Sequence, residues 1–312
     1  MKGTKSFKNV SGKAVVLGFC FLLSALGTAA QNPQFLEAAK KRLNKEFSDS
    51  QRRSIELADV CAIETDPLAS RVFWEYGSIF VADNDVRLPD KCIYPSSSFV
   101  EAFQAKLERK KELIGTAEIE LQVIAMEHLL KAINDAGQLR LTITPLHGQI
   151  AGGRSFADTV RLWNSRYYRA LDHWARRGKI TSEEAAAARI LPLDLQIKKV
   201  VEWEANGVYF STNFSKSIFY SVAPPGTSQH LSLLAFDVVE ADDQRIRAIM
   251  NKHGWFQTIR TDKPHFTFLG RAETELPYHG LRNIYYEGNS YWVPSVEPVG
   301  TAGSVPLNLP AT

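Results

Sequence analysis

Residues 226 to 237 read GTSQHLSLLAFD and place His230 and Asp237 in an otherwise apolar run. The turn APPG precedes this run, and the polar segment VVEADDQ follows it. Two interpretations are open: the two residues are ligands of one metal, or they are polar residues of an ordinary strand. Zinc in a hydrolase requires three protein ligands and one open position for water. The choice therefore depends on a third ligand from elsewhere in the chain.

The segment TDKPHFTFLG, residues 261 to 270, offers that ligand. His265 stands at the start of a predicted strand, Asp262 lies three residues before it, and Pro264 restricts the backbone between them. A zinc hydrolase needs a histidine that binds the metal and a nearby carboxylate that accepts a proton from water. The helical H-E-x-x-H motif of many zinc proteases is absent. Because a metal site is defined by ligand count and geometry, spacing alone leaves the structural interpretation open.

The first thirty residues have the pattern of a secretory signal peptide. Four lysines precede the apolar run AVVLGFCFLLSAL, and the small-residue stretch GTAAQ follows it, which predicts cleavage near Ala30. The run is short for a membrane span, although an uncleaved anchor is the alternative. We therefore expect a secreted or periplasmic protein without stable membrane insertion after signal cleavage.

Charge and cysteine content narrow the class of protein further. The chain has 37 Lys and Arg against 34 Asp and Glu, so removal of the four leader lysines leaves 33 against 34, a net charge of −1. This balance gives no electrostatic support for a nucleic-acid partner. Cys61 and Cys92 are an even pair in an exported chain and predict a disulfide worth about 3 to 4 kcal/mol, with a free buried pair as the alternative.

Hydrophobic periodicity and turn signals predict an α+β fold, with a small antiparallel sheet at the metal site and helices packed on one side. At 312 residues the chain is long enough for one large or two ordinary domains. The predicted helices cover 32–62, 97–115, 117–137, 156–178, 179–206 and 242–254. The predicted strands cover 71–82, 139–146, 207–214, 217–226, 255–260 and 265–270, in addition to the strand-like stretch 226–237.

Three segments resemble elements of the VanY-type D-Ala-D-Ala carboxypeptidases, whose zinc peptidase superfamily also includes lysostaphin and hedgehog. PPGTSQHLSLLAFDV is similar to the family element RPGTSEHQTGLAVD, and AGGRSFADTVRLW is similar to an earlier element, SGYRSYADQ. DKPHFTFLG resembles the closing element, in which an acidic residue stands three positions before the last zinc histidine. Three elements in the family's order, between residues 139 and 270, are more specific than any one of them.

The resemblance implies a role for each matched residue. His230, Asp237 and His265 would bind zinc, and Asp262 would act as general base and acid. Arg154 would hold the substrate or polarise the scissile carbonyl, for which a guanidinium is suited. The alternative for this arginine is a surface cation beside a glycine turn.

The chain departs from the family pattern at several positions. Leu233 replaces a glycine, Gln229 replaces a glutamate, Gly153 replaces a tyrosine, and Thr159 stands near an expected glutamine. An insertion at about 167–220 separates the arginine element from the histidine element. It would form a lid or a binding wall, or its aromatic residues would pack in the core. These departures do not affect the predicted ligands, but the motifs no longer define the class of substrate.

The residue patterns and the resemblance together predict a domain organisation. A signal peptide would cover 1–30, a mainly helical N-terminal region 31–137, a zinc peptidase-like domain with the helical insertion 138–293, and a flexible tail 294–312. The sequence does not indicate the task of the N-terminal region or the oligomeric state.

The predicted function is zinc-dependent hydrolysis of peptidoglycan stem peptides in the cell wall. An aspartate at the base position favours the endopeptidase branch of the family, whereas PPGTSQH favours the D,D-carboxypeptidases. The alternative is a non-catalytic, zinc-stabilised binding or scaffold protein of the same fold, as in hedgehog. A weaker alternative is an exported protein without a metal.

Overall fold

The computed structural model describes residues 33–51 and 56–295. The predicted signal peptide, 1–30, and nearly all of the predicted tail, 294–312, lie outside those residues. None of the helices in the described ranges has the length and apolar character required to cross a membrane.

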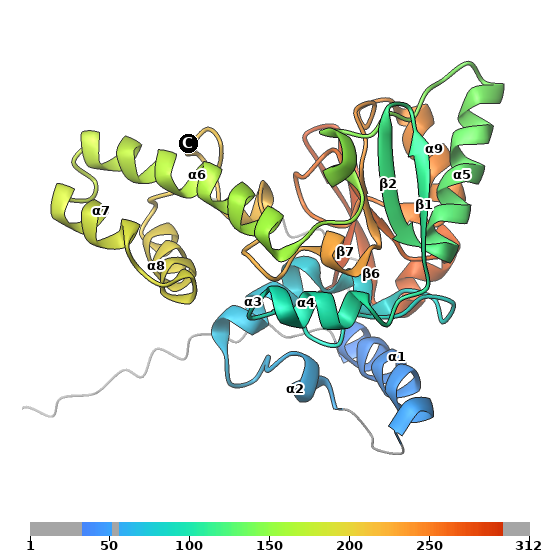
Figure 1. The fold of residues 1–312 in the computed structure, drawn as a ribbon, viewed down its shortest axis with the longest axis horizontal. Coiled ribbons are helices and arrows are strands. Elements are labelled where there is room, and N and C mark those ends of the chain that lie inside the picture. The colour runs from blue at the N-terminus through green and yellow to red at the C-terminus, as the bar shows by residue number, and fades with distance from the viewer. Residues whose placement is uncertain (1–32, 52–55, 296–312) are drawn as a thin grey trace, which may run out of the picture.

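The fold is α+β, as predicted, but its strands form three small antiparallel sheets (Figure 1). The helices lie on several sides of the strands, with α5 on the right of the view, α1, α3 and α4 below, and α6 to α8 on the left, rather than on one side alone. The α-helices are α1 (Pro33–Gln51), α2 (Leu57–Val60), α3 (Pro67–Tyr76), α4 (Ser97–Gln104), α5 (Val123–Gln138), α6 (Phe156–Arg176), α7 (Ser182–Arg189), α8 (Leu193–Ala205) and α9 (Gln244–Lys252). The strands are β1 (Arg109–Ile114), β2 (Ala117–Gln122), β3 (Ala235–Asp237), β4 (Trp255–Phe256), β5 (His265–Phe268), β6 (Leu281–Tyr286) and β7 (Asn289–Pro294).

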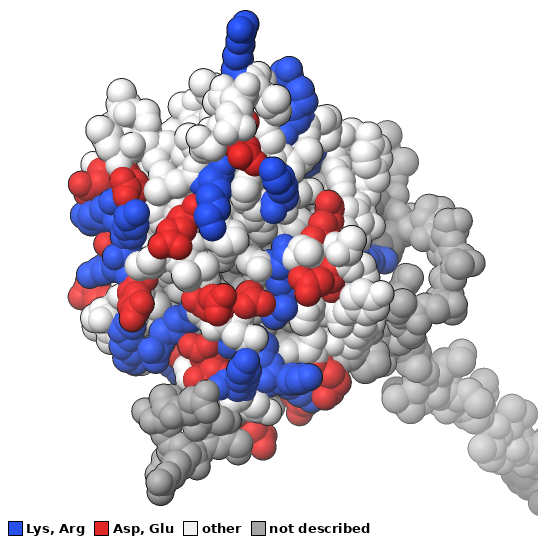
Figure 2. Space-filling model, turned by 90° about the vertical axis from the view of Figure 1, so that its right-hand side faces the viewer, with Lys and Arg blue, Asp and Glu red and all other residues white. Residues whose placement is uncertain are grey.

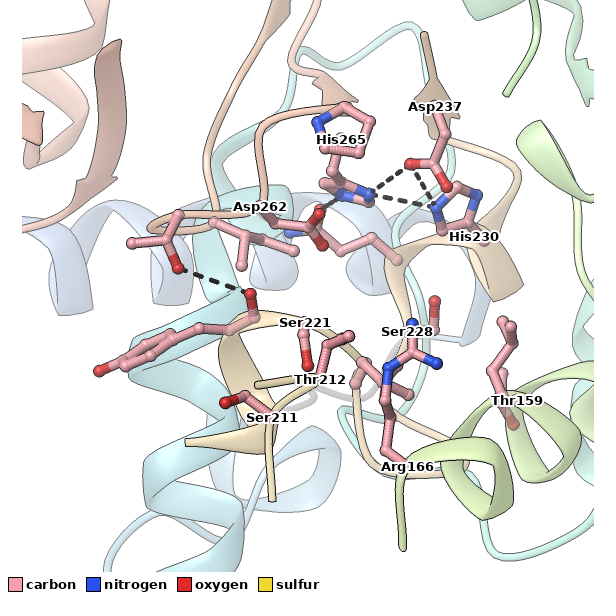
Figure 3. A pocket seen from close by; sticks show the side chains of 18 of the residues that line it. Thr159, Arg166, Ser211, Thr212, Ser221, Ser228, His230, Asp237, Asp262 and His265 are labelled. Carbon is pink, nitrogen blue, oxygen red and sulfur yellow. Dashed lines mark hydrogen bonds and ion pairs between the residues drawn. The ribbon is translucent and has the colours of Figure 1, made fainter. Parts of the chain in front are cut away.

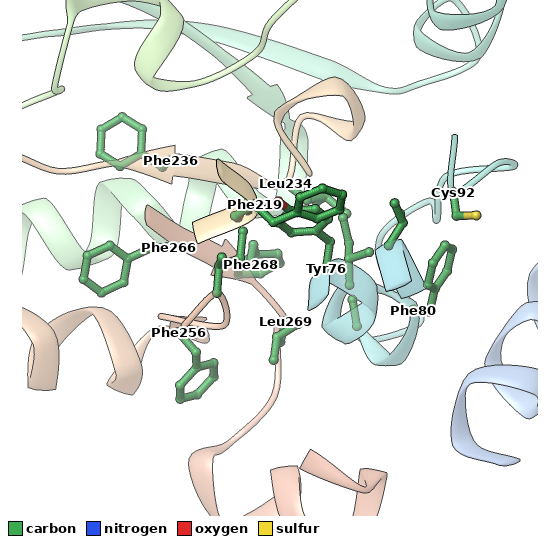
Figure 4. Close-up of a cluster of buried hydrophobic side chains, with 14 of the residues drawn as sticks. Tyr76, Phe80, Cys92, Phe219, Leu234, Phe236, Phe256, Phe266, Phe268 and Leu269 are labelled. Atoms are coloured by element: carbon green, nitrogen blue, oxygen red, sulfur yellow. Dashed lines mark hydrogen bonds between the residues drawn. The ribbon is translucent and has the colours of Figure 1, made fainter. Parts of the chain in front are cut away.

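The sheet with the order β3-β5-β4 separates the predicted site from the core. β3 and β5 are antiparallel, and Asp237 stands directly opposite His265. Successive side chains of a strand point to opposite faces, so these two residues share one face while Phe236 and Phe266 share the other. The two phenylalanines belong to the main buried cluster, which Figure 4 shows in part.

The N-terminal region contains more sheet and less helix than predicted. Residues 97–115 and 117–137 were each expected to form one helix, but α4 ends at Gln104, α5 begins at Val123, and β1 and β2 form a hairpin between them. Burial alternates along both strands, which is the period of a sheet and not of a helix. Gly115 is therefore the turn of this hairpin, with φ +62°, and not the end of a helix.

Other predicted strands are also wrong. Residues 71–82 form the end of α3 and a 3-10 turn, because Val72, Phe73 and Tyr76 are buried at helical spacing. Residues 207–226 form loops with one short 3-10 turn, and 139–146 contribute only a bridge from Pro145 to Val238. The hairpin of β6 and β7 was not predicted.

The prediction of helix for residues 179–206 is confirmed, in the form of α7 and α8. Thr181 caps α7 as the sequence TSEE predicts, and its hydroxyl accepts a hydrogen bond from the Glu184 amide at 3.0 Å. The side chains of Trp203 and Phe210 are buried and stack with centroids 5.6 Å apart, so these aromatic residues fill the core of the insertion. The predicted disulfide between Cys61 and Cys92 is also present, with Cα atoms 5.2 Å apart.

The surface charge near the β1–β2 hairpin is mixed in sign. Figure 2 shows Lys and Arg interspersed with Asp and Glu on this face. Neighbouring ion pairs explain the pattern, with Lys111 2.8 Å from Glu118 and Lys252 2.7 Å from Asp135. This face therefore has no continuous basic surface of the kind that nucleic acids require.

Candidate metal centre

The three predicted ligands meet at one point although they come from separate segments. His230 Nε2 lies 3.1 Å from His265 Nδ1 and 3.3 Å from Asp237 Oδ1, and His265 Nδ1 lies 3.1 Å from that same oxygen (Figure 3). All three residues are buried. Within the described part of the chain, they form the one group of three or more His, Cys, Asp or Glu residues that could hold a metal ion.

Local backbone structure explains how the residues converge. Asp237 and His265 are cross-strand neighbours on β3 and β5, so the sheet itself places them together. His230 lies in a 3-10 turn, Gln229–Ser232, which ends at Leu233 in the left-handed region with φ +60°. This turn reverses the chain between the histidine and β3. The separation of seven residues between His230 and Asp237 is thus closed by a turn and not by an extended strand.

Hydrogen bonds fix which nitrogen of each imidazole carries the proton. His230 Nδ1 donates to the carbonyl oxygen of Gly152 at 2.6 Å, which leaves Nε2 as an acceptor. His265 Nε2 donates to Gln229 Oε1 at 2.8 Å, which leaves Nδ1 as an acceptor. The Gln229 amide cannot be reversed because its nitrogen donates to the Tyr76 carbonyl oxygen at 2.7 Å. The hydrogen bonds from His230 Nδ1 and from His265 Nε2 are of the kind that orients metal-binding histidines.

With both rings neutral, the three facing atoms all present lone pairs to one another, which is unfavourable unless a cation lies between them. A proton does not fill this role on His230, because burial lowers the pKa of its ring to about 4. Burial opposes the charge of Asp237, but the adjacent Arg154 guanidinium favours it, and the pKa of the carboxyl lies well below its usual range. The donor set of two imidazole nitrogens and one carboxylate oxygen suits zinc.

The spacing of the donor atoms agrees with zinc as well. Zinc bonds of about 2.0 to 2.1 Å in tetrahedral geometry place neighbouring ligand atoms about 3.3 Å apart. The three separations of 3.1, 3.1 and 3.3 Å match that value. The residues present thus fit a zinc ion.

Arg154 contacts a predicted ligand directly. Its Nη2 forms an ion pair with Asp237 Oδ2, and its Nε donates to the carbonyl oxygen of Ile150 at 2.8 Å. The side chain is only 12% exposed, so it is not a surface cation. In this position the guanidinium neutralises Asp237 and orients the carboxylate so that Oδ1 faces the two histidines.

Asp262 lies beside the cluster, at the edge of a cleft of about 500 Å³. Burial raises the pKa of this carboxyl to about 6, although the neighbouring His265 lowers it. A carboxyl that titrates close to neutral pH can exchange protons with a substrate at working pH. The geometry thus brings all five predicted site residues to one cleft.

Gly153 and Leu233 lie against one another beside the site. A Cβ atom at Gly153 would lie 2.4 Å from Leu233 Cδ2, so the leucine fills the space that a larger side chain at 153 would need. Leu233 in turn is buried in a small apolar cluster with Tyr94 and Phe103. The packing of Leu233 therefore depends on the absence of a side chain at position 153.

Gln229 is a site residue whose role the sequence did not reveal, because the sequence showed only a departure from glutamate. We expect Gln229→Leu, which keeps the volume but removes the acceptor for His265, to weaken zinc affinity by about 10- to 100-fold. Competition with a chelator would measure the change. Gln196→Leu, at a buried glutamine of α8, is the matched control. Equal zinc affinity in the two variants would contradict the role of Gln229.

Comparison with known proteins adds one distant likeness. No family model and no curated protein matches the chain. A solved structure of the vancomycin resistance D,D-pentapeptidase VanY, an alanine mutant from a VanB-type resistance cassette in complex with Zn(II), is similar with 13% sequence identity and a TM-score of 0.32. The likeness covers 56% of this chain and 86% of that one. Similarity at this level assigns no function to the chain.

Proposed function

We propose that this protein is an exported zinc-dependent peptidase that hydrolyses peptidoglycan stem peptides. The observation that carries the proposal is the convergence of His230, Asp237 and His265, whose lone pairs face one centre at the spacing of a tetrahedral zinc site. Asp262 borders the same cleft and can exchange protons near neutral pH. The predicted signal peptide and the disulfide favour an oxidising compartment, and the three family-like segments favour a cell-wall peptide as substrate.

Each residue of the site has a separate role in the proposed reaction. Zinc, when bound, acts as a Lewis acid toward the scissile carbonyl and lowers the pKa of a water molecule. Asp262 accepts the proton of the attacking water and returns it to the leaving amine. Arg154 holds Asp237 in its ligating orientation, and Gln229 does the same for His265.

The experiment is to incubate the mature chain with muropeptides, with and without a chelator, and to identify the products by mass spectrometry. We expect cleavage that stops with the chelator and returns when zinc is added. The product masses distinguish loss of a terminal D-alanine from cleavage of an internal bond. Stoichiometric zinc without any cleavage would support the scaffold alternative, and absence of zinc would contradict both.

Hydrolysis is expected to fall as the pH drops through the pKa of Asp262. Burial raises this pKa to about 6, and below it the carboxyl is protonated and cannot accept a proton. A nearby dication favours the carboxylate, so we expect the acidic limb of kcat/KM to have its midpoint at or below pH 6. Burial lowers the pKa of His230 to about 4, so this ligand remains neutral over that range. Zinc content measured at each pH is the control, and an acidic limb that merely follows zinc loss would contradict the assignment.

A further inference from the structure

Two basic side chains line the cleft and form no ion pair with any described carboxylate. Arg166 lies on α6, and Lys216 lies in the loop that follows α8. Among the described residues, neither has a carboxylate within ion-pair distance, whereas the third cation of the cleft, Arg154, is paired with Asp237. The cleft therefore contains two positive charges that form no ion pair with a described residue, although the carboxyl group of Asp262 in the same cleft interacts with both at longer range.

Arg166 is placed to receive an anion. Figure 3 shows its guanidinium pointing from α6 into the cavity, across from the side that holds His230 and Asp237. The Nε atom is buried and has no hydrogen-bond acceptor in the described part of the chain, and Nη1 donates only to the Ser165 hydroxyl at 2.9 Å. A buried donor without an acceptor costs free energy, and a carboxylate is the acceptor that a guanidinium binds best.

Lys216 lines the same cleft and belongs to a loop that is held by hydrogen bonds. The amide of Lys216 donates to the Ser211 hydroxyl, and its carbonyl oxygen accepts from the Ser211 amide, both at 3.2 Å. The next residue, Ser217, donates to the buried carboxylate of Glu204 at 2.5 Å, which also accepts from the Ile218 amide at 2.7 Å. Arg71 donates to the Ser217 hydroxyl at 2.6 Å. The buried network anchors the loop, so the lysine approaches the cleft from a defined backbone position.

We propose that Arg166 and Lys216 form a carboxylate-binding subsite, contributed by the segment between the arginine element and the histidine element. The inference rests on the proposed function, because the ligand would be an anionic peptide whose scissile bond lies at the metal centre. The carboxylate is either the free C-terminus of the peptide or that of an internal acidic residue. The first case makes the protein a carboxypeptidase and the second an endopeptidase.

Binding of matched peptides tests the subsite without relying on turnover. The full mature chain carrying Asp262→Asn is loaded with zinc and titrated with diacetyl-L-lysyl-D-alanyl-D-alanine and with its C-terminal amide. A second pair, both amidated at the C-terminus, contains an internal γ-linked D-glutamate or its neutral D-isoglutamine analogue. We expect the charged member of one pair to bind about 10- to 100-fold more tightly, as a charge-assisted hydrogen bond predicts. The pair that shows the preference identifies the carboxylate.

Substitution of the two cations then assigns the preference. Arg166→Gln and Lys216→Gln, made separately in the same background, are expected to reduce the preference for the charged peptide and to leave binding of the neutral peptide unchanged. Arg166→Lys should retain part of it. Arg176→Gln removes an exposed charge from the same helix outside the cleft and is the matched control.

Two results would overturn the subsite: equal binding of charged and neutral peptides in both pairs, or a preference that persists in both glutamine variants. Persistence would mean that another group, such as the metal, binds the carboxylate. If the chain binds no zinc or cleaves no peptide but shows a preference that depends on Arg166 and Lys216, only the proposed function fails. The two proposals are thus separable.

Discussion

Asp262→Asn is expected to lower kcat/KM by about 100- to 10,000-fold while zinc remains bound. The asparagine amide has nearly the shape of the carboxyl but cannot accept a proton from the attacking water. Asp262 is not a member of the ligand cluster, so the metal centre should be unaffected. Steady-state kinetics on the identified muropeptide, with zinc content measured in the same samples, would check both parts.

The matched control is Asp242→Asn, at an exposed carboxylate 3.5 Å from the Lys263 ammonium. We expect this variant to retain full activity. If Asp262→Asn binds zinc and hydrolyses the peptide at the rate of the unmodified chain, another group accepts the proton, and the assignment of the base is wrong.

His265→Ala is expected to abolish both zinc binding and hydrolysis. The substitution leaves one imidazole and one carboxylate, which is fewer than the three protein ligands of a catalytic zinc site. It should also abolish the stabilisation that the metal provides. At a free zinc concentration about 100 times the Kd, that stabilisation is about 2.7 kcal/mol for the unmodified chain. Denaturant unfolding with and without zinc would measure it.

His230→Ala should behave in the same way, because its Nε2 belongs to the same cluster. His279→Ala is the control, since His279 is only partly buried and lies outside the cleft. Stoichiometric zinc in His265→Ala, or a zinc-dependent gain in stability equal to that of the unmodified chain, would show that the metal is held elsewhere.

The sequence predicted the long helices better than the strands. Helices such as α6 and α9 have an apolar face at helical spacing and recognisable caps, and this information is local. The strands of the described chain are two to six residues long, which is too short for alternation to stand out from chance. For this reason the sequence pattern predicts helix where β1 and β2 lie, although Gly115 marks their turn.

The site shows the same division between local and long-range information. Motif resemblance selected His230, Asp237, His265, Asp262 and Arg154, and the structure brings these residues to one cleft. The ion pair of Arg154 with Asp237 was not predictable, because the two residues are 83 positions apart and each has several chemically reasonable partners.

By itself the sequence determined which residues can bind a metal or transfer a proton. It also determined where the long helices lie and which cysteines pair. Each of these follows from residue type and local spacing. The tertiary structure alone decided which imidazole nitrogens keep their lone pairs, through the Gly152 carbonyl and the Gln229 amide. It also decided that Arg166 and Lys216 face one cleft. Such contacts join segments far apart in the chain, and the packing of the whole fold determines their geometry.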